Sequence, residues 1–279
     1  MSLTDQEVEA IRSRVRNVRE NVLRMIHNAA SGHVGGSLSA AEILGVLYFK
    51  VLRVDPQNPD WPERDRFVMS KGHASAGYYA TLAEAGFISP AELLTFDCIN
   101  SRLQGHPDKN KTPGVDMSTG SLGQGLSVGC GMALGARLKN LDVRVYVLLG
   151  DGELNEGQVW EAAMSAAKYG LDNLTAIVDR NNVQLVGPTE ENMPLEPLEE
   201  KWKAFGWEVL SADGHDIRDL YEKLIRAREI KGKPAVLIAR TMKGKGVSFM
   251  EGTAAWHSKA PSDAELAMAL RELGGETGV

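Results

Sequence analysis

Two kinds of apolar pattern divide this chain into helices and strands. Residues 4–28 carry apolar side chains every three or four positions, which predicts an amphipathic helix. The runs at 143–150 and 174–179 are apolar almost throughout, which predicts strands buried on both faces, as in a parallel sheet. Further expected strands are 66–70, 206–212 and 234–240, and further expected helices are 40–52, 123–139, 156–169 and 216–229.

Strands that alternate with helices favour an α/β fold, a parallel sheet with helices on both faces. We expect residues 1–279 to form one domain of this kind, with a helical N-terminal section and a C-terminal tail. Segments 31–39 and 55–65 are expected to be loops. Residues 100–120 form a longer polar segment, and loops of that length in compact domains are usually functional or disordered.

The composition fits a globular protein and narrows the function classes. The chain has 279 residues, of which 43% are hydrophobic and 24% charged. A net charge of −6 argues against nucleic acid as the main partner. No run approaches the roughly 18 apolar residues of a membrane span and no signal peptide precedes the first helix, so a cytoplasmic location is expected. Cys98 and Cys130 lack metal-binding spacing and are expected to be reduced thiols.

Polar residues follow two of the expected strands. Asp151 comes directly after the 143–150 strand, and Asn181 comes shortly after the 174–179 strand. Ligands bind beyond the carboxyl ends of strands in open α/β sheets, so neighbouring strands would bring both side chains to one crevice. A carboxylate, an amide oxygen and a nearby backbone carbonyl, that of Val183, suit Mg²⁺, or else Ca²⁺ or Mn²⁺, rather than zinc.

The residues around Asp151 favour a phosphate beside the metal. Gly150 and Gly152 allow the backbone to approach a phosphate closely. The helix expected to begin near Glu156 would point its N-terminus, with its positive dipole, at the same place. The alternative interpretation is an ordinary tight turn followed by an asparagine-containing loop.

The spacing of these motifs resembles the thiamine diphosphate motif, GDG followed about thirty residues later by NN, which transketolases share with pyruvate-dehydrogenase-type α subunits. Four other segments resemble transketolase segments in particular. "SGHVGGSLS" contains His33, "SKGHAS" contains His73, "QGHPD" contains His106, and "GKGVSF…WHSKAP" contains His257. The resemblance covers residues 10–262 and identifies the chain as similar to the transketolase family.

A fifth segment, "STGSLGQG", resembles the transketolase "TTGPLGQG" segment that closes over the cofactor diphosphate. It departs from that pattern at Ser121, where a proline is usual. "GQGLSVG" lacks the dinucleotide-binding spacing and precedes a strand rather than following one, so a nicotinamide site is rejected. For "KGKG", surface charges and a role of Lys243 and Lys245 near the diphosphate remain alternatives.

The resemblance implies thiamine diphosphate and Mg²⁺ as cofactors, and transfer of a two-carbon ketol unit from a ketose phosphate to an aldose phosphate. It implies that His33 and His106 contact ketose oxygens and that His73 and His257 lie near the diphosphate and the sugar. Histidines suit this work because they exchange protons near pH 7. The cofactor-binding residues it implies are His73, Gly120, Ser121, Leu122, Gly150, Asp151, Gly152, Glu156, Asn181 and His257. His27 and His215, the latter in "DGHD", are expected to be structural.

A complete transketolase is a much longer chain. In the family, the glutamate that activates the cofactor and the residues that grip the sugar phosphate belong to other domains. The resemblance therefore implies the N-terminal (α) subunit of a split transketolase. It would be inactive without a partner that carries the pyrimidine-binding and C-terminal domains, in an α₂β₂ assembly. Three alternatives remain: a piece of a longer chain, another thiamine diphosphate enzyme such as a 2-oxo acid dehydrogenase or deoxyxylulose phosphate synthase, and a non-catalytic binding partner.

Overall fold

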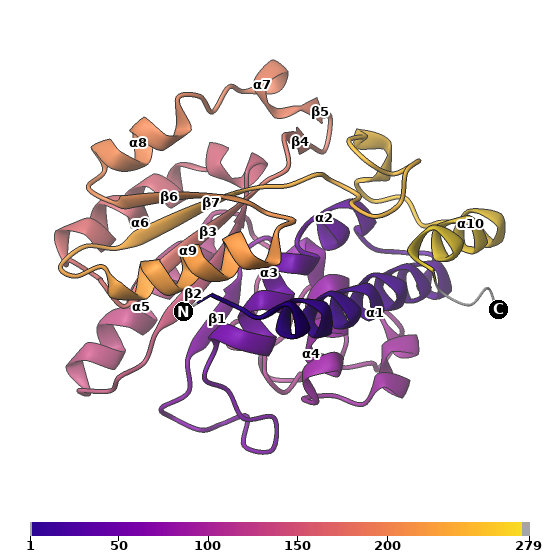
Figure 1. The fold of residues 1–279 in the computed structure, drawn as a ribbon, viewed down its shortest axis with the longest axis horizontal. Coiled ribbons are helices and arrows are strands. Elements are labelled where there is room, and N and C mark those ends of the chain that lie inside the picture. Colours follow the sequence, from indigo (N-terminus) through magenta and orange to yellow (C-terminus); the bar gives the residue numbers. More distant parts are fainter. Residues whose placement is uncertain (1, 275–279) are drawn as a thin grey trace.

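A five-stranded sheet forms the centre of the computed structural model, which describes residues 2–274 (Figure 1). The strand order is β1-β2-β3-β7-β6, and every neighbouring pair is parallel. The strands are β1 (Arg66–Met69), β2 (Val145–Gly150), β3 (Leu174–Arg180), β6 (Glu208–Asp213) and β7 (Ala235–Arg240). All five expected strands are thus confirmed. Because β2 and β3 are neighbours, with Gly150 opposite Asp179, the residues that follow them reach the same edge.

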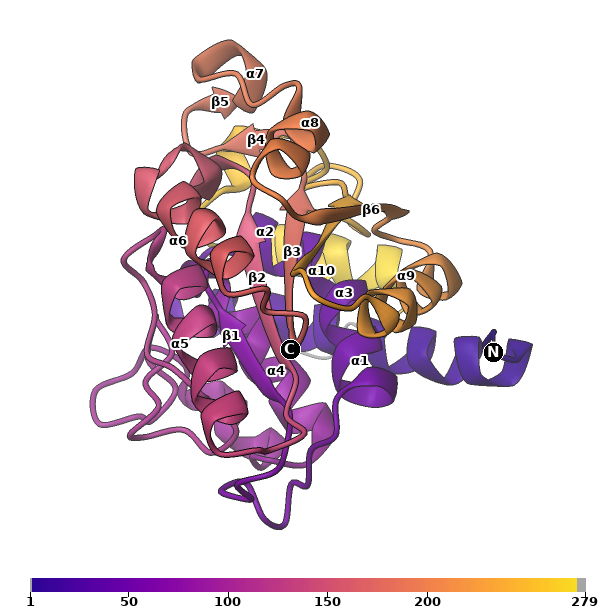
Figure 2. The ribbon, with the colours of Figure 1, turned by 90° about the vertical axis from the view of Figure 1, so that its left-hand side faces the viewer.

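Helices cover both faces of the sheet, as predicted (Figure 2). Successive residues of β2 point to opposite faces, so Val147 packs into one core and Leu148 into the other. The first core is closed by α5 (Gln124–Leu138), α6 (Gly157–Lys168) and α8 (Leu198–Ala204). The second is closed by α1 (Asp5–Ala29), α3 (Ala41–Val46), α4 (Ser75–Ala85) and α9 (Ile217–Glu229).

Shorter elements surround the carboxyl ends of the strands. Beyond β3, β4 (Val183–Gln184) and β5 (Gly187–Pro188) form an antiparallel hairpin, followed by α7 (Thr189–Asn192). A π-helical segment (Leu47–Val51) continues α3, and the two together confirm the helix expected over 40–52. The other elements are α2 (Val34–Ser39), α10 (Asp263–Leu273) and 3₁₀ turns at Gly72–Ala74, Pro90–Thr95, Gly152–Asn155 and Ala254–Trp256.

Capping boxes start the first and the last helix. In α1 the Thr4 side chain accepts from the Glu7 N–H while Glu7 accepts from the Thr4 N–H. Ser262 and Glu265 repeat this arrangement at the start of α10. Each pair satisfies two backbone donors that a helix N-terminus otherwise leaves open. The two helices pack against each other on one side of the molecule (Figure 1).

The segment 31–39 is not the loop that the sequence predicts. From Val34 onward it forms α2, and every residue of that helix is buried. A side chain at Gly35 would lie 2.8 Å from the carbonyl oxygen of Trp256. The two glycines of α2, Gly35 and Gly36, lower intrinsic helix propensity, but close packing requires the small size of Gly35, and this tertiary packing overrides the local preference.

The other expected loops are irregular, as predicted. Residues 55–65 and 100–120 contain turns but no helix or strand. The Arg64 guanidinium anchors the long loop through two bonds to the Asp116 carboxylate, at 2.7 and 3.0 Å. Cys98 and Cys130 are free thiols. Among residues 2–274, no helix combines the length and the apolar character that crossing a membrane requires.

Candidate active site

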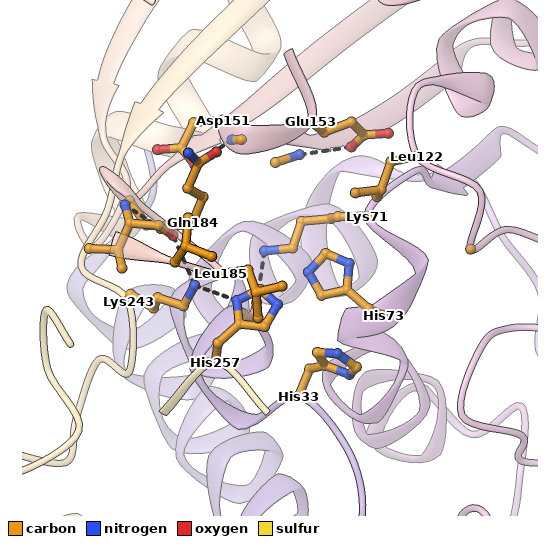
Figure 3. Close-up of a pocket in the computed structure, with 17 residues that line it drawn as sticks. His33, Lys71, His73, Leu122, Asp151, Glu153, Gln184, Leu185, Lys243 and His257 are labelled. Atoms are coloured by element: carbon orange, nitrogen blue, oxygen red, sulfur yellow. Dashed lines mark hydrogen bonds between the residues drawn. The ribbon is translucent and has the colours of Figure 1, made fainter. Parts of the chain in front are cut away.

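Loops that follow four of the five strands meet at the carboxyl edge of the sheet and enclose a cavity of about 470 Å³ (Figure 3). This is where open α/β sheets bind ligands, because their strands all end at one edge. The cavity is lined by His33, Gly36, Lys71, His73, Gly120, Leu122, Gly150, Asp151, Gly152, Glu153, Asn181, Val183, Gln184, Leu185, Val186, Lys243 and His257.

Asp151 sits at the turn after β2 with its carboxylate almost wholly buried. One oxygen accepts from the Gly152 N–H at 2.8 Å, and the other accepts from the Asn182 N–H at 2.6 Å. Arg180 also approaches this second oxygen, at 3.2 Å. Burial raises the pKa of Asp151, and the nearby charge of Asp179 adds to the rise. A cation at the open side of the carboxylate would therefore be strongly stabilising.

The three oxygens that the sequence predicts for a metal ion belong to one wall of the cavity. The Asn181 amide oxygen accepts from the Val183 N–H at 3.1 Å, and the Val183 carbonyl accepts from the Lys243 ammonium at 2.8 Å. Together with Asp151 these oxygens fit a hard cation such as Mg²⁺. No cluster of three or more His, Cys, Asp or Glu side chains in residues 2–274 could hold a metal, so an ion here depends on the amide and carbonyl oxygens.

A buried ion pair underlies this wall, and the sequence patterns do not predict it. The Lys71 ammonium donates to the Asp179 carboxylate and, at 2.8 Å, to the Gly36 carbonyl oxygen. Ser39 also donates to Asp179, at 2.6 Å. Burial acts to raise the pKa of Asp179, but the Lys71 charge and the hydrogen bonds from Lys71, Ser39 and Thr241 together hold the pKa below its usual range. The pair ties α2 to the ends of β1 and β3 and leaves a cation at the cavity surface.

The Glu153 side chain connects three sequence segments that resemble cofactor-binding motifs: "SKGHAS", "STGSLGQG" and "GDG". Its carboxylate accepts from the Gly123 N–H at 2.9 Å, the Gly150 N–H at 3.0 Å and the Ser70 hydroxyl. Burial raises the pKa of Glu153, although these donors and Lys71 oppose the rise. The carboxylate therefore fixes the relative positions of the loops after β1 and β2 and of the start of α5.

Three histidines predicted for the site converge at the other end of the cavity (Figure 3). The ring centroids of His33, His73 and His257 lie 5.0 to 5.4 Å from one another. Burial lowers the pKa of each ring, and neighbouring cations add to the effect, Lys71 for His73 and Lys243 for His257. The pKa of His257 falls to about 3. All three rings are therefore neutral at pH 7 and can accept protons.

The fourth predicted histidine lies in an adjoining cavity of about 400 Å³. His106 is exposed there, and His33 lines both cavities. Gly120, which lines the first cavity, packs closely against His106, since a side chain at Gly120 would come within 2.9 Å of the His106 ring. The remaining lining residues of this outer cavity are Ser31, Gly32, Asp97, Gln104 and Gly105.

Two predicted cofactor residues do not line either cavity. Ser121 is exposed beside Leu122, which does line the first cavity. Glu156 is exposed at the N-cap of α6, and its side chain packs toward Gly123 instead. The backbone turns between Glu153 and Glu156, so these two acids point to different sides.

The two remaining histidines, which the sequence suggests are structural, do not line either of these two cavities. His27 contacts the Pro261 carbonyl oxygen at 2.9 Å. His215 contacts Glu42 and the backbone of Met242.

Several cavity residues are not predicted from the sequence. Lys71 directly follows the expected 66–70 strand, and a charged residue in that position is a signal for the strand edge; Glu153 lies inside the turn after Gly150 and is marked only by its place next to the motif residue Gly152. Leu185 and Val186 lie on the β4–β5 hairpin at the cavity, yet their side chains are 61% and 74% exposed. Nothing local distinguishes such an exposed apolar pair from core residues of a strand.

The chain matches the family described as "Transketolase, thiamine diphosphate binding domain" over residues 11–277. It is 46% identical over 275 residues to a subunit of the apulose-4-phosphate transketolase of Actinobacillus succinogenes, covering 99% of each chain. It is 44% identical over 272 residues to the 6-deoxy-6-sulfo-D-fructose transketolase subunit of a Clostridium species, covering 97% of this chain and 98% of that protein.

Single-chain relatives are much longer. Human transketolase is 42% identical over 255 residues, which are 91% of this chain but 40% of that protein. The solved transketolase of Campylobacter jejuni matches with a TM-score of 0.91 and 33% identity, covering 99% of this chain and 44% of that one. The chain thus spans about two fifths of single-chain transketolases and nearly all of the relatives named as subunits.

Proposed function

We propose that this chain is the N-terminal (α) subunit of a two-chain transketolase. The premise is that the chain belongs to the transketolase family. The observation that carries the proposal is one cavity with oxygen ligands at the strand edge and three neutral histidines opposite them. The transketolase names of the relatives favour this function over a 2-oxo acid dehydrogenase or a deoxyxylulose phosphate synthase.

Asp151, Asn181 and the Val183 carbonyl would hold Mg²⁺, and Gly150 and Gly152 would allow a diphosphate to approach the ion. Thiamine diphosphate, when bound, supplies the carbanion-stabilising group that cleavage of a ketose requires.

Lys71 and Lys243 bring positive charge to the cavity between these oxygens and the histidines. The Lys243 ammonium lies 2.8 Å from the Val183 carbonyl oxygen and 2.8 Å from Nδ1 of His257. The pKa of Lys243 is lowered to about 8, by burial first and then by the charge of Lys71. A diphosphate would restore the ammonium form of Lys243 fully, because an adjacent anion favours the charged state.

The histidine end is suited to move protons on the sugar. His33, His73 and His257 are neutral rings that can each donate or accept a hydrogen bond to the sugar, and a bound diphosphate anion would raise their lowered pKa values toward the range that suits general acid–base catalysis. His33 lies between the two cavities, so a sugar bound across both would pass its ring. We assign His33 and His106 to the ketose oxygens, and His73 and His257 to the region between diphosphate and sugar.

The proposal includes a partner chain. This chain spans about two fifths of single-chain transketolases, and the other domains of that family would come from the partner. The exposed Leu185 and Val186 beside the cavity would be covered by it. We propose that the chain forms one cofactor-binding domain and works in an α₂β₂ assembly in the cytoplasm. Ketose and aldose phosphates would be its substrates.

The test is an assay for ketol transfer from a ketose phosphate to an aldose phosphate with thiamine diphosphate and Mg²⁺. The chain is purified alone and after coproduction with the protein encoded beside it. Activity that needs both chains supports the proposal. Activity of this chain alone would contradict the partner requirement, and cofactor binding without ketol transfer by any tested complex would contradict the assigned reaction.

A further inference from the structure

Behind Lys243, outside both cavities, four groups form a continuous hydrogen-bonded chain. The Arg19 guanidinium of α1 donates to the Glu42 carboxylate of α3 at 2.6 Å. The same carboxylate oxygen lies 3.0 Å from Nδ1 of His215, in the turn between β6 and α9. Nε2 of His215 lies 2.8 Å from the backbone nitrogen of Met242, the residue before Lys243. The chain of bonds therefore connects the N-terminal helices to the loop that follows β7.

The donor and acceptor of each hydrogen bond in this series can be assigned. The Met242 N–H can only donate, so Nε2 of His215 carries no proton. The proton of neutral His215 is then on Nδ1 and donates to Glu42. Burial acts to raise the pKa of Glu42, but the Arg19 charge and the hydrogen bonds from Arg19 and His215 together lower it and keep the carboxylate ionised. Arg19 thus orients Glu42, Glu42 orients His215, and His215 holds the Met242 N–H.

The loop around Lys243 is held on both sides of that residue. The Met242 N–H donates to His215, and the Gly244 N–H donates to the Gly35 carbonyl oxygen at 3.0 Å. The turn that carries His215 packs tightly on β7, since a side chain at Gly214 would lie 2.8 Å from the Arg240 carbonyl oxygen. With its neighbours fixed, the Lys243 ammonium reaches the cavity, 2.8 Å from the Val183 carbonyl.

Lys245 provides the contrast within the same loop. It lies two residues further on, does not line either cavity, and pairs with Glu251 at 3.5 Å near the surface. Of these two lysines, Lys243 alone lies between the two fixed N–H groups. The geometry therefore separates a lysine that is positioned for the cavity from one that is not.

We propose that His215 is a positioning residue that aims Lys243 at the diphosphate end of the cavity through the Met242 N–H. This rests on the proposed function, because that function puts a diphosphate there. His215 touches neither cavity, so its effect on the cofactor passes through the loop.

The experiment measures the dissociation constant of thiamine diphosphate with Mg²⁺ by calorimetry, in the complex coproduced with the partner. His215→Met removes the acceptor at similar volume, and His215→Gln retains an oxygen that can accept from Met242. We expect His215→Met to weaken binding about tenfold, the lower end of what groups that orient a ligand-binding residue contribute. His215→Gln should recover most of that loss, and Lys245→Ala should bind like the wild type.

The decisive comparison is made in a Lys243→Met background. If His215 acts through Lys243, adding His215→Met there changes the dissociation constant little, because the two changes share one pathway. A tenfold loss in both backgrounds, or no loss in either, would overturn the proposal. A wild-type complex that does not bind the cofactor would instead contradict the proposed function.

If His215→Met does not fold, Glu42→Gln replaces it. That change keeps the shape but weakens the orientation of His215. We expect a smaller loss of affinity in the wild-type background, about threefold, and none with Lys243→Met. Equal losses in the two backgrounds, or an unchanged dissociation constant in both, would again overturn the proposal.

Discussion

The two ends of the cavity are built in different ways. At the strand edge, Asp151 and Asn181 occupy turns that directly follow adjacent parallel strands, and backbone N–H groups hold their oxygens. At the histidine end, His33, His73 and His257 come from three separate segments that tertiary contacts bring together, and Nδ1 of His257 also lies 2.8 Å from the Lys243 ammonium. The sheet therefore sets the first end directly, whereas the second depends on loops. We infer that the first end binds the cofactor and the second carries out proton transfer.

Asp151→Asn should produce the largest of the predicted effects. It should disrupt the strand-edge end of the cavity and leave the histidine end intact. We expect affinity for thiamine diphosphate with Mg²⁺ to fall at least about 100-fold, since Asp151 supplies the only carboxylate of the proposed ligand set. Calorimetry of the two-chain complex measures this. The midpoint of thermal unfolding without cofactor should fall modestly, because the Asn NH₂ group would face one of the two backbone N–H groups that now donate to Asp151, and Arg180 would lose a charged partner. Wild-type affinity would refute the metal site.

His33→Ala should break the histidine end alone. We expect kcat for ketol transfer to fall about 100-fold, the usual contribution of a positioned proton-transfer group. The dissociation constant of the cofactor should not change, because His33 lies away from the strand edge (Figure 3). Steady-state kinetics together with calorimetry separates the two quantities, and a wild-type rate would remove His33 from the catalytic residues.

Lys243→Met tests the charge between the two ends through its pH dependence. The pKa of Lys243 is about 8 in the fold, against 10.5 for an exposed lysine. Between these values the unfolded chain binds more protons than the folded one, so the free energy of unfolding rises with pH. The variant should lack that rise and should be more stable at pH 7 by up to about 3 kcal/mol.

Urea unfolding of the cofactor-free chain from pH 7 to 10.5 measures the Lys243→Met difference. Lys245→Ala is the matched control and should follow the wild-type profile, since Lys245 pairs only at the surface. Parallel profiles for the wild type and Lys243→Met would contradict the buried position of this ammonium.

Glu153→Gln should give the smallest of these effects. It tests whether the Glu153 carboxylate holds together the loops at the strand edge. The amide keeps the size of the side chain, but its NH₂ group would face backbone N–H groups that now donate to a carboxylate. Leaving one such buried donor unpaired should reduce the free energy of unfolding by about 1–2 kcal/mol. Chemical denaturation measures this, and an unchanged free energy would show that Glu153 does not link the loops.

The strand edge can be predicted from the sequence because its information is local. Apolar runs identify the strands, and parallel strands bring the residues that follow them to one edge, so the order of residues along the chain is enough to place Asp151 and Asn181 together. The four histidines are identified through family resemblance rather than through spacing.

What the sequence does not reveal depends on contacts between distant segments. Lys71 and Asp179 pair across 108 residues, and nothing local marks either as half of an ion pair. The helix α2 forms because burial and close packing outweigh its two glycines. The outward directions of Ser121 and Glu156 depend on backbone turns that a motif does not specify.

The division of the cavity into a binding end and a reacting end is tested most directly by calorimetry. Thiamine diphosphate is titrated into the two-chain complex, with and without Mg²⁺, for wild type, Asp151→Asn and His33→Ala. We predict Mg²⁺-dependent binding that Asp151→Asn loses and His33→Ala retains. Equal loss of binding in both variants would contradict that division.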